Sequence, residues 1–412
     1  MKNMYRFLVI SAGLFLTGCS LTTTETITTV NTTEPVEIWT IEDLQNLEAG
    51  QNATLMANLD LNSINWTPLF SYAEPYTGTF NGNGFTISNL TISSNNSDYN
   101  GLFAAIEGDV YDLNITDFNI YYLTQFVTFA GGLAGYCSGN ITNVSVVGEI
   151  DISNSTSSTY AGLLAGVAQI KMSSTTNASD FTPNTISLSS AIGSIQVNSK
   201  YFAYVGGLVG KTYSYEVIQN TVSATIDVTT LVYRAYVGGL IGHNYGGILI
   251  GYEDAVETTD INICQNVISS ELSVTSNGVH ASVGGIIGYD QYGVLFDNFA
   301  VSTIAASGME LYVGSLIGEE WYGKLDTSVA VSEYIIIEEE GQMLFLSSLV
   351  GYHINNTLLE DNYYLVVSNT TYEQTDGQVV ANSSLESSSW YIDQLGWSEE
   401  VFDFSIINSF LP

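Results

Sequence analysis

A glycine-rich phrase of six residues recurs along the chain. It reads VGGLVG at Val205–Gly210, VGGLIG at Val237–Gly242 and VGGIIG at Val283–Gly288. Four of the six steps between successive copies are about 30 residues long, and two are about 45. The last glycines of the phrase and of its degenerate copies are Gly135, Gly166, Gly210, Gly242, Gly288, Gly318 and Gly351. Since a unit of this length holds one supersecondary element, the chain is predicted to stack similar coils into an array.

Each unit contains a segment with the alternation of a β-strand. In NTVSATIDV (220–228), the apolar residues Val222, Ala224, Ile226 and Val228 fall on one side. Between residues 100 and 370 no segment has a convincing helical pattern. The sequence therefore predicts an all-β fold, a parallel β-helix (β-solenoid) with repeats of about 30 residues. A β-propeller is the alternative, although a blade normally takes four strands and about 40 residues.

The N-terminus has the pattern of an export signal. Lys2 and Arg6 precede the short apolar run 7–16, which is too short for a comfortable transmembrane helix. The following Leu-Thr-Gly-Cys, ending at Cys19, resembles the lipobox of bacterial lipoproteins. The resemblance implies a signal peptide over 1–18, acylation of Cys19, and an extracytoplasmic location at the bacterial cell surface. The alternative is an ordinary secretory peptide with an incidental cysteine.

The charge balance excludes two kinds of direct partner. The chain has 42 acidic and 7 basic residues, for a net charge of −35. Nucleic acid and anionic membrane surfaces are recognised through clusters of Lys and Arg, which this chain lacks. We therefore expect no nucleic-acid partner, and contact with the membrane only through the lipid on Cys19.

The repeated phrase and both ends of the chain resemble the GLUG-motif family of bacterial surface proteins. The resemblance rests on the Gly-Gly-Leu-Val-Gly repeats, on YTGTFNGNGFTISNLTI (76–92) near the start and on YIDQLGWSEEVFDFSI (391–406) near the end. It implies a right-handed β-helix and export to the cell surface, and the family has no common catalytic residues. The expected organisation is a signal peptide (1–18), a Thr-rich tether (19–36), opening coils or cap (37–100), a repeat β-helix (101–370) and a closing segment (371–412).

Sequence motifs for catalysis and metal binding are missing. Some proteins with GLUG repeats carry a metallopeptidase domain, but this chain has no H-E-x-x-H. Its three histidines, His243, His280 and His353, are expected to be ordinary exposed residues. Lys200 and Arg234 precede glycine phrases and are expected on adjacent coils, which makes them the one place to look for the base of a lyase. No catalytic residue, cofactor or metal site is predicted.

Aromatic residues recur just before the glycine phrase. Six of the seven positions are aromatic: Phe129, Tyr160, Tyr204, Tyr236, Ser282, Tyr312 and Phe345. Equivalent positions stack in a solenoid, so this register predicts an aromatic ladder along one wall. We interpret the ladder as packing between coils, with face-on binding of sugar rings as the alternative.

A second aromatic group follows the phrase in a looser register. Its members are Tyr136, Tyr213, Tyr245, Tyr289, Trp321 and Tyr352. We expect these residues on loops at one edge, where exposed aromatic side chains are candidates for ligand contact. The alternative is that they fold back to cover the coils.

Together these patterns favour a lipid-anchored surface protein whose β-helix acts in binding or adhesion without catalysis. The expected partner is a surface glycan, or a protein of a host or a neighbouring cell. The alternative is a carbohydrate-active β-helix enzyme, such as a polysaccharide lyase or a glycosidase. A purely structural role at the surface remains a third hypothesis.

Overall fold

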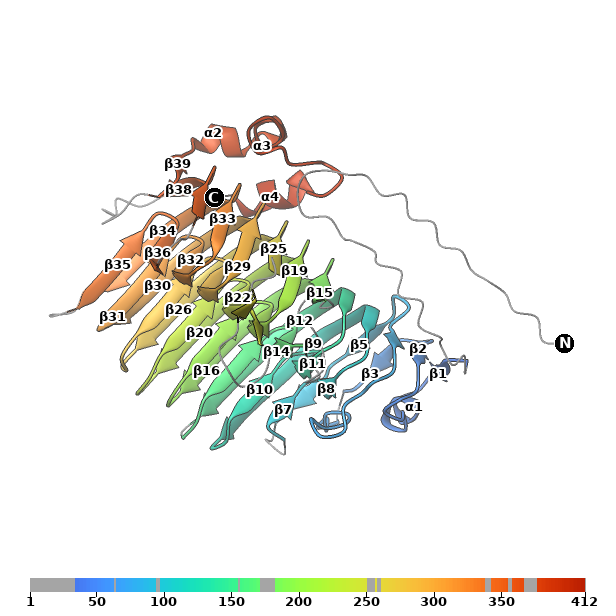
Figure 1. Cartoon of the computed structure of the whole chain (residues 1–412). Coiled ribbons are helices and arrows are strands. Elements are labelled where there is room, and N and C mark those ends of the chain that lie inside the picture. Colours follow the sequence, from blue (N-terminus) through green and yellow to red (C-terminus); the bar gives the residue numbers. More distant parts are fainter. Residues whose placement is uncertain are drawn as a thin grey trace.

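The protein is a parallel β-helix, in which the chain winds through successive coils and each strand pairs with strands of the neighbouring coils (Figure 1). The computed structural model describes residues 34–62, 64–93, 97–154, 156–170, 182–249, 256–257, 261–337, 342–354, 358–366 and 376–411. The predicted all-β solenoid is confirmed, and no helix occurs among the described residues between 100 and 370. The predicted signal peptide (1–18) and Cys19 lie outside the described residues.

The largest sheet, sheet 1, has 21 described strands. They form a strip of long strands, a strip of short strands and the strands of the opening coils. The long strands are β9 (Val110–Thr124), β12 (Ile141–Asn154), β16 (Ser190–Ser199), β20 (Thr221–Thr230), β26 (Val267–Ser276), β30 (Phe299–Gly308) and β34 (Val329–Ile337), followed by β38 (Tyr363–Val366) and β39 (Gln378–Val379). The short strip comprises β15 (Asn184–Ser187), β19 (Tyr215–Ile218), β25 (Ile261–Cys264), β29 (Gly293–Phe296), β33 (Lys324–Asp326) and β37 (Leu358–Glu360). The opening coils supply β1 (Val36–Ile38), β2 (Ala53–Leu55), β3 (Leu59–Asp60), β4 (Phe80–Asn81), β5 (Thr86–Ser88) and β6 (Thr91–Ile92).

Two further sheets of eight described strands complete the coils. Sheet 2 comprises β7 (Tyr99–Asn100), β10 (Thr128–Ala130), β13 (Thr159–Gly162), β17 (Ala203–Gly206), β21 (Ala235–Gly238), β27 (Ala281–Gly284), β31 (Glu310–Gly314) and β35 (Met343–Ser347). Sheet 3 comprises β8 (Phe103–Ile106), β11 (Ala134–Cys137), β14 (Ala165–Gln169), β18 (Val209–Tyr213), β22 (Ile241–Tyr245), β28 (Ile287–Gln291), β32 (Ile317–Trp321) and β36 (Val350–Ile354). A small antiparallel pair, β23 (Ile248–Leu249) with β24 (Val256–Glu257), lies within the longer step between Gly242 and Gly288.

The glycine phrase forms the tight corner between sheets 2 and 3. A Cβ atom on Gly242 would lie 2.4 Å from the backbone nitrogen of Val205 and 2.5 Å from the carbonyl oxygen of Gly210. No side chain fits between backbones that approach so closely, so the third glycine of the phrase is required by contact between strands. The repeated phrase therefore marks the corner where two walls of the β-helix meet.

An asparagine ladder occupies another corner, directly before the long strands. Asn266 Oδ1 accepts a hydrogen bond from Asn220 N at 3.0 Å, and Asn298 Oδ1 accepts one from Asn266 N at 3.1 Å. Asn362 accepts in the same way from Ser328 N at 3.0 Å. These amides satisfy backbone groups that turn inward at the corner, where sheet pairing is interrupted.

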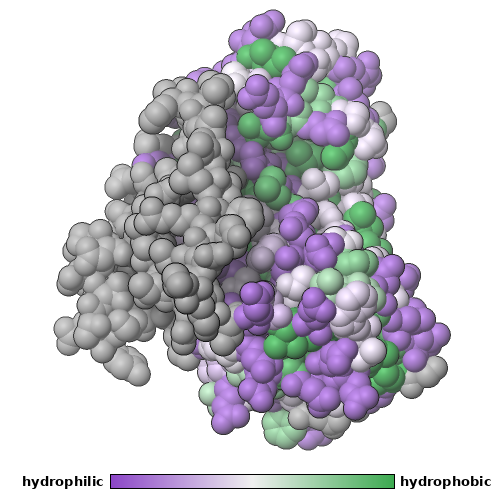
Figure 2. All heavy atoms as spheres, turned by 90° about the vertical axis from the view of Figure 1, so that its right-hand side faces the viewer, coloured by the Kyte–Doolittle hydropathy of each residue, from purple (hydrophilic) through white to green (hydrophobic). Residues whose placement is uncertain are grey.

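The interior is filled by apolar side chains that alternate along the long strands. Val222, Ala224, Ile226 and Val228 are all buried, as the period-two pattern predicts. The face seen in Figure 2 shows hydrophobic side chains dispersed among hydrophilic ones. Burial of one face of every strand against the opposite walls is the main stabilising contribution to such a coil.

Helices occur only near the two ends of the described chain. The N-terminal α1 (Ile41–Gln45) begins with a capping box between Thr40 and Asp43. In the predicted closing segment, α2 (Asn382–Leu385), α3 (Ser388–Leu395) and α4 (Phe404–Phe410) lie along one side of the β-helix (Figure 1).

The C-terminal helices cover part of the outer face of sheet 1. Tyr391 and Trp397 pack in one hydrophobic cluster with Phe299 of β30, and Trp397 Nε1 donates to Asp297 Oδ1 at 3.1 Å. Within the described residues, no helix is both long and apolar enough to cross a bilayer.

Candidate functional site

The predicted aromatic ladder runs along sheet 2. Phe129 pairs in register with Tyr160, Tyr160 with Tyr204, and Tyr204 with Tyr236. Successive ring centroids in this series are 4.7, 4.5 and 5.3 Å apart, and all three pairs are stacked. The ladder prediction is confirmed, and it extends to Tyr99, whose ring stacks on Phe129 at 4.6 Å. Because the ring faces cover one another, the inner rings leave no free face for a sugar.

Ser282 interrupts the ladder, and a histidine fills the gap. Ser282 pairs in register with Tyr236 on one side and Tyr312 on the other. The ring of His280, two residues earlier, lies edge-on to Tyr312 with centroids 4.4 Å apart. A polar group therefore replaces an aromatic ring at this one level of the wall.

A second row of side chains faces the ladder from sheet 3. Each member directly follows the last glycine of a phrase, and neighbours in the row pair in parallel register. The row is Tyr136, Val167, Lys211, His243, Tyr289, Glu319 and Tyr352. It contacts the ladder across the corner, with Tyr236 and Tyr289 at 5.1 Å and Tyr312 and Tyr352 at 4.8 Å between ring centroids. We call these two facing rows the aromatic corner.

The six candidate contact aromatics therefore lie in sheet 3 and divide between two rows. Tyr136, Tyr289 and Tyr352 belong to the aromatic corner, whereas Tyr213, Tyr245 and Trp321 lie two residues further along their strands. The expectation that they sit on loops at an edge is wrong, because the phrase is followed directly by a strand. Tyr136 and Tyr289 are buried, and the other four are partly buried.

One end of the aromatic corner is hollow. The cavity has a volume of about 200 Å³, and we call it the Lys211 pocket. Its lining consists of Tyr72, Tyr99, Phe129, Tyr136, Tyr160, Val167, Gln169, Lys211 and Tyr213. Tyr72, half exposed, stacks on Tyr99 with centroids 4.9 Å apart. Two of the six candidate aromatics, Tyr136 and Tyr213, thus line a cavity.

Lys211 is the charged group of this pocket. Its side chain is 8% exposed, and its Nζ lies 4.8 Å from the ring centroid of Tyr204 and 4.5 Å from that of Tyr213. Burial lowers the pKa of Lys211 to about 8. The neighbouring His243 is also buried, and burial, together with the charge on Lys211, holds the pKa of His243 well below its usual range.

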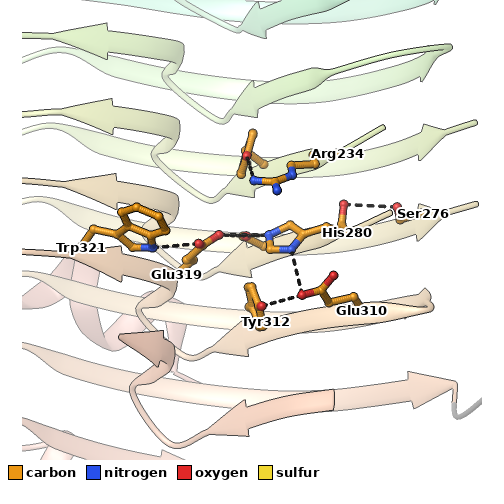
Figure 3. Close-up of polar contacts among 9 residues, drawn as sticks. Arg234, Ser276, His280, Glu310, Tyr312, Glu319 and Trp321 are labelled. Atoms are coloured by element: carbon orange, nitrogen blue, oxygen red, sulfur yellow. Dashed lines mark hydrogen bonds and ion pairs between the residues drawn. The ribbon is translucent and has the colours of Figure 1, made fainter. Parts of the chain in front are cut away.

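A polar cluster lies three strands further along the same corner, and we call it the Glu319 cluster (Figure 3). Glu319 Oε2 lies 3.0 Å from His280 Nε2 and accepts from Ser282 Oγ at 2.9 Å. Its Oε1 accepts from Trp321 Nε1 at 2.9 Å. Glu319 is 3% exposed and is therefore a buried carboxylate with three donors.

The Glu319 cluster does not have the arrangement of a catalytic triad. His280 Nε2 lies 2.7 Å from Ser282 Oγ and 3.0 Å from Glu319 Oε2, so the hydroxyl and the carboxyl group share one ring nitrogen. Ser282 Oγ donates to Glu319 Oε2, whereas the carboxylate of a catalytic triad contacts the other ring nitrogen of the histidine. Glu310 Oε1 is 3.8 Å from Nδ1, beyond hydrogen-bond distance. The arrangement joins these side chains by hydrogen bonds and lacks the relay geometry of a triad.

The histidine and lyase-base expectations have mixed outcomes. His353 is exposed, but His243 and His280 are buried within the aromatic corner, so the expectation is wrong for those two. Lys200 and Arg234 are near neighbours on adjacent coils, since Val232 N donates to Lys200 O at 2.9 Å. Their side chains engage different tyrosines and form no common site: Lys200 lies over Tyr201, whereas Arg234 donates to Tyr236.

Two carboxyl groups lie in the interior behind the aromatic corner. They belong to Asp290 and Glu320, which directly follow Tyr289 and Glu319 along their strands. Asp290 Oδ1 accepts from Asn244 Nδ2 at 2.6 Å, and its Oδ2 accepts from Gly293 N at 3.0 Å. Glu320 is fully buried, and neither of its oxygens has a hydrogen-bond partner in the described chain. A Cβ on Gly323 would lie 2.1 Å from Glu320 Oε1 and 2.8 Å from Asp290 Oδ2, so the two carboxyl groups converge there.

Burial raises the pKa of both interior carboxyl groups. The pKa of Asp290 is raised to about 7, and that of Glu320 is raised well above its ordinary value by burial and by the neighbouring Asp290. Among the described residues, no group of three or more His, Cys, Asp or Glu side chains is arranged to hold a metal ion.

A larger hollow of about 650 Å³ lies where long strands of sheet 1 end. Its lining is apolar or uncharged: Leu123, Thr124, Gln125, Phe126, Ser153, Asn154, Asn198, Thr229 and Leu231. It is a shallow, exposed surface, since Leu123 is 83% and Phe126 67% exposed. It therefore has none of the charged groups that distinguish the aromatic corner.

Comparisons with known proteins give a sequence match to part of this chain and a structural similarity at low sequence identity. No protein-family model matches the sequence. A segment of 134 residues is 29% identical to halomucin of Haloquadratum walsbyi; it covers 28% of this chain and 1% of halomucin. A solved structure of a proposed immunoglobulin A1 protease from Bacteroides ovatus is similar with a TM-score of 0.47 and 16% identity, over 87% of each chain.

Proposed function

We propose that this chain is a non-catalytic binding module of the bacterial cell surface, and that its Lys211 pocket accommodates a sugar unit of a surface glycan. The observation that carries the proposal is the pocket itself. Six aromatic side chains and one buried lysine surround a cavity at the end of a rigid ladder. A site built on strands holds its side chains in place before a ligand arrives, which reduces the entropy lost on binding.

The size and polarity of the pocket suit one sugar ring. Its volume of about 200 Å³ is below the ~300–1,000 Å³ typical of pockets for drug-sized ligands. The lining tyrosines outside sheet 2, which are Tyr72, Tyr136 and Tyr213, combine an apolar ring with a hydroxyl, so they can contact both the C–H face and the hydroxyl groups of a sugar. Gln169 adds an amide to the lining. A single unit of a longer glycan therefore fits better than an extended oligosaccharide.

Binding without cleavage is favoured by where the carboxylates lie. Glycosidases use two carboxyl groups placed ~5–10 Å apart on either side of the scissile bond. The residues that line the Lys211 pocket include no Asp or Glu. Further along the corner, the carboxyl group of Glu319 has its acceptors occupied by side chains of the protein itself.

The proposed location rests on the N-terminal sequence. The lipobox-like residues before Cys19 would provide a lipid anchor, and the Thr-rich stretch that follows would serve as a tether between lipid and β-helix. A glycan of the same or a neighbouring surface would then lie within reach of the pocket. A host or neighbouring-cell protein that displays such a glycan is the corresponding partner.

The test uses the chain from residue 20 onward, screened on a glycan array and then titrated with the glycans retained. Tyr72 is half exposed and lines the pocket, so Tyr72→Ala is expected to weaken binding about tenfold by removing one aromatic wall. The matched control is Tyr322→Ala, because Tyr322 is similarly exposed and stacks on Tyr292 away from the pocket.

Three outcomes would contradict the proposal. Retention of no glycan would remove the binding function. Equal affinity of wild type and Tyr72→Ala would place the site elsewhere. Release of shorter oligosaccharides from a bound polymer, detected by mass spectrometry, would instead support the carbohydrate-active enzyme.

A further inference from the structure

Lys211 is a buried cation without a counter-ion in the described part of the chain. Its side chain is 8% exposed, and no Asp or Glu oxygen forms an ion pair with its Nζ among the described residues. Lysine is almost never buried to this degree unless it is paired. The two tyrosine rings beside Nζ stabilise the charge only in part, because a cation–π contact is weaker than an ion pair with hydrogen bonds.

The composition of the chain makes the lack of a carboxylate beside Lys211 informative. With 42 acidic and 7 basic residues, the sequence offers abundant carboxylates that could face a buried lysine. Its neighbours in the row are Val167 and His243 instead, and the pocket in front of it is lined by uncharged side chains. A group that belongs to the ligand would complete the environment of this cation.

We propose that Lys211 recognises the negative charge of an acidic sugar unit, with the sugar's carboxylate placed at Nζ and its ring within the aromatic pocket. This inference rests on the proposed glycan-binding function and specifies its ligand class. A carboxylate next to the ammonium gives a charge-assisted hydrogen bond, which is stronger beside a buried cation than in water. The aromatic lining holds the ring to which the carboxylate is attached.

The ligand is an otherwise neutral glycan with a single acidic unit. A polyanion would be repelled by a protein whose net charge is −35. A single acidic unit that enters a cavity next to Lys211 meets favourable charge locally, and the neutral units that follow it avoid the repulsion. An acidic peptide offers the same carboxylate, but a cavity of about 200 Å³ lined by aromatic rings fits a sugar ring better than an extended backbone.

The groups packed around Lys211 do not titrate near neutral pH. Burial raises the pKa of Tyr213 to about 12, and it raises the pKa of Tyr204 and Tyr160 above their usual values. On the neighbouring strand β22, the pKa of His243 is held low. A change in affinity between pH 7 and pH 9 would therefore report on Lys211, whose pKa lies at about 8.

The experiment compares two probes by isothermal titration calorimetry. The first is a xylo-oligosaccharide whose only charged unit is one terminal glucuronic acid. The second is the same molecule with its carboxyl group reduced to the alcohol. The wild type is expected to bind the acid at least tenfold more tightly, and Lys211→Met is expected to lose that preference. Lys200→Met is the matched control, because it removes a lysine that also lies over a tyrosine but does not line the pocket.

A pH series separates recognition of charge from a structural role. Affinity for the acid is expected to be constant below pH 8 and to fall about tenfold per pH unit above it, because deprotonation of the free lysine competes with binding. Lys211→Arg keeps its charge at all these pH values, so its preference for the acid should stay flat. A merely structural effect of the side chain would not give this difference.

The outcomes separate this inference from the function on which it depends. Equal binding of both sugars by the wild type, or a preference for the acid that persists in Lys211→Met, would overturn the role of Lys211 and leave glycan binding intact. Binding of neither sugar nor any other glycan would overturn the proposed function as well. Tighter binding of an acidic hexapeptide, or of a polyuronate, than of the singly acidic sugar would overturn the ligand class.

Discussion

The Lys211 pocket and the Glu319 cluster each contain a buried charged side chain, but only the charge of Glu319 has polar partners within the described part of the chain. Both groups belong to one row of sheet 3, and both side chains are buried, at 8% and 3% exposed. Glu319 accepts hydrogen bonds from Ser282 and Trp321 and faces His280, whereas Lys211 faces two aromatic rings and a cavity. Burial alone therefore does not identify a functional charge on this wall. The presence or absence of a partner within the protein distinguishes the two.

The largest loss of stability is expected when the side chain of Glu319 is removed and its partners remain. Glu319→Ala leaves His280, Ser282 and Trp321 without their common acceptor in a buried site. Loss of a buried charged acceptor costs about 3–5 kcal/mol, so the free energy of unfolding should fall by about 4 kcal/mol. Urea denaturation followed by circular dichroism measures this change.

The control for this variant is Glu271→Ala, since Glu271 is exposed on β26. That change should alter the free energy of unfolding by less than about 0.5 kcal/mol. If Glu319→Ala were as mild as Glu271→Ala, the distinction between a partnered and an unpartnered charge would lose its basis.

The architecture of this wall could be predicted from the sequence because its signals repeat in register. The spacing of glycine phrases predicted the coils, and the residue before each phrase predicted the ladder, including the exception at Ser282. The facing row was also visible, since each member directly follows the last glycine of a phrase. It was missed because its chemistry varies from valine to lysine to glutamate, so no single residue type recurs there to mark the register.

The burial of individual charges could not be predicted in the same way. Lys211 and Glu319 occupy one register position, yet one faces a cavity and the other faces His280 from a neighbouring coil. That difference depends on which side chain stands opposite across a tight corner, and the sequence positions of these partners are 37 to 39 residues apart. The histidines were misjudged for the same reason, because a polar residue type is usually exposed.

Glu320, which follows Glu319 in the sequence, gives a third case for this comparison. It is a buried carboxyl group with no partner in the described chain. Its raised pKa means that the folded state keeps this proton to higher pH than the unfolded chain does. Stability from this group is therefore present at low pH and declines as pH rises, by about 1.4 kcal/mol per unit. Glu320→Gln removes this group from the titration.

We expect Glu320→Gln to match the wild type in stability near pH 4.5 and to be more stable than the wild type near pH 7. Some decline with pH remains in the variant, because the pKa of Asp290 is raised to about 7. Chemical denaturation of both proteins across this range measures the difference. Parallel stability curves for the two proteins would show that Glu320 finds a partner in solution.

The smallest effect concerns Lys211 itself and has the opposite sign to that of Glu319. Burial lowers the pKa of Lys211 to about 8, below its unfolded value of 10.5, so the charged form is disfavoured in the folded state. Lys211→Met removes that penalty and keeps a side chain of similar length between the two tyrosine rings. Holding the buried cation costs about 3 kcal/mol, and loss of its contacts with the two tyrosine rings offsets about 1 kcal/mol. The variant is therefore expected to be more stable than the wild type by about 2 kcal/mol at pH 7.

The pH dependence of this gain shows whether it comes from the charge. Below pH 8 the folded wild type holds the buried cation, and the penalty is fully present. Between pH 8 and pH 10.5 the folded state releases its proton while the unfolded chain keeps one, so the wild type gains stability and the advantage of Lys211→Met shrinks. Thermal unfolding of both proteins at pH 7 and pH 10 measures this. If Lys211→Met destabilised the protein at pH 7, the ammonium would be contributing to the fold as Glu319 does, and the contrast between the two ends of the corner would disappear.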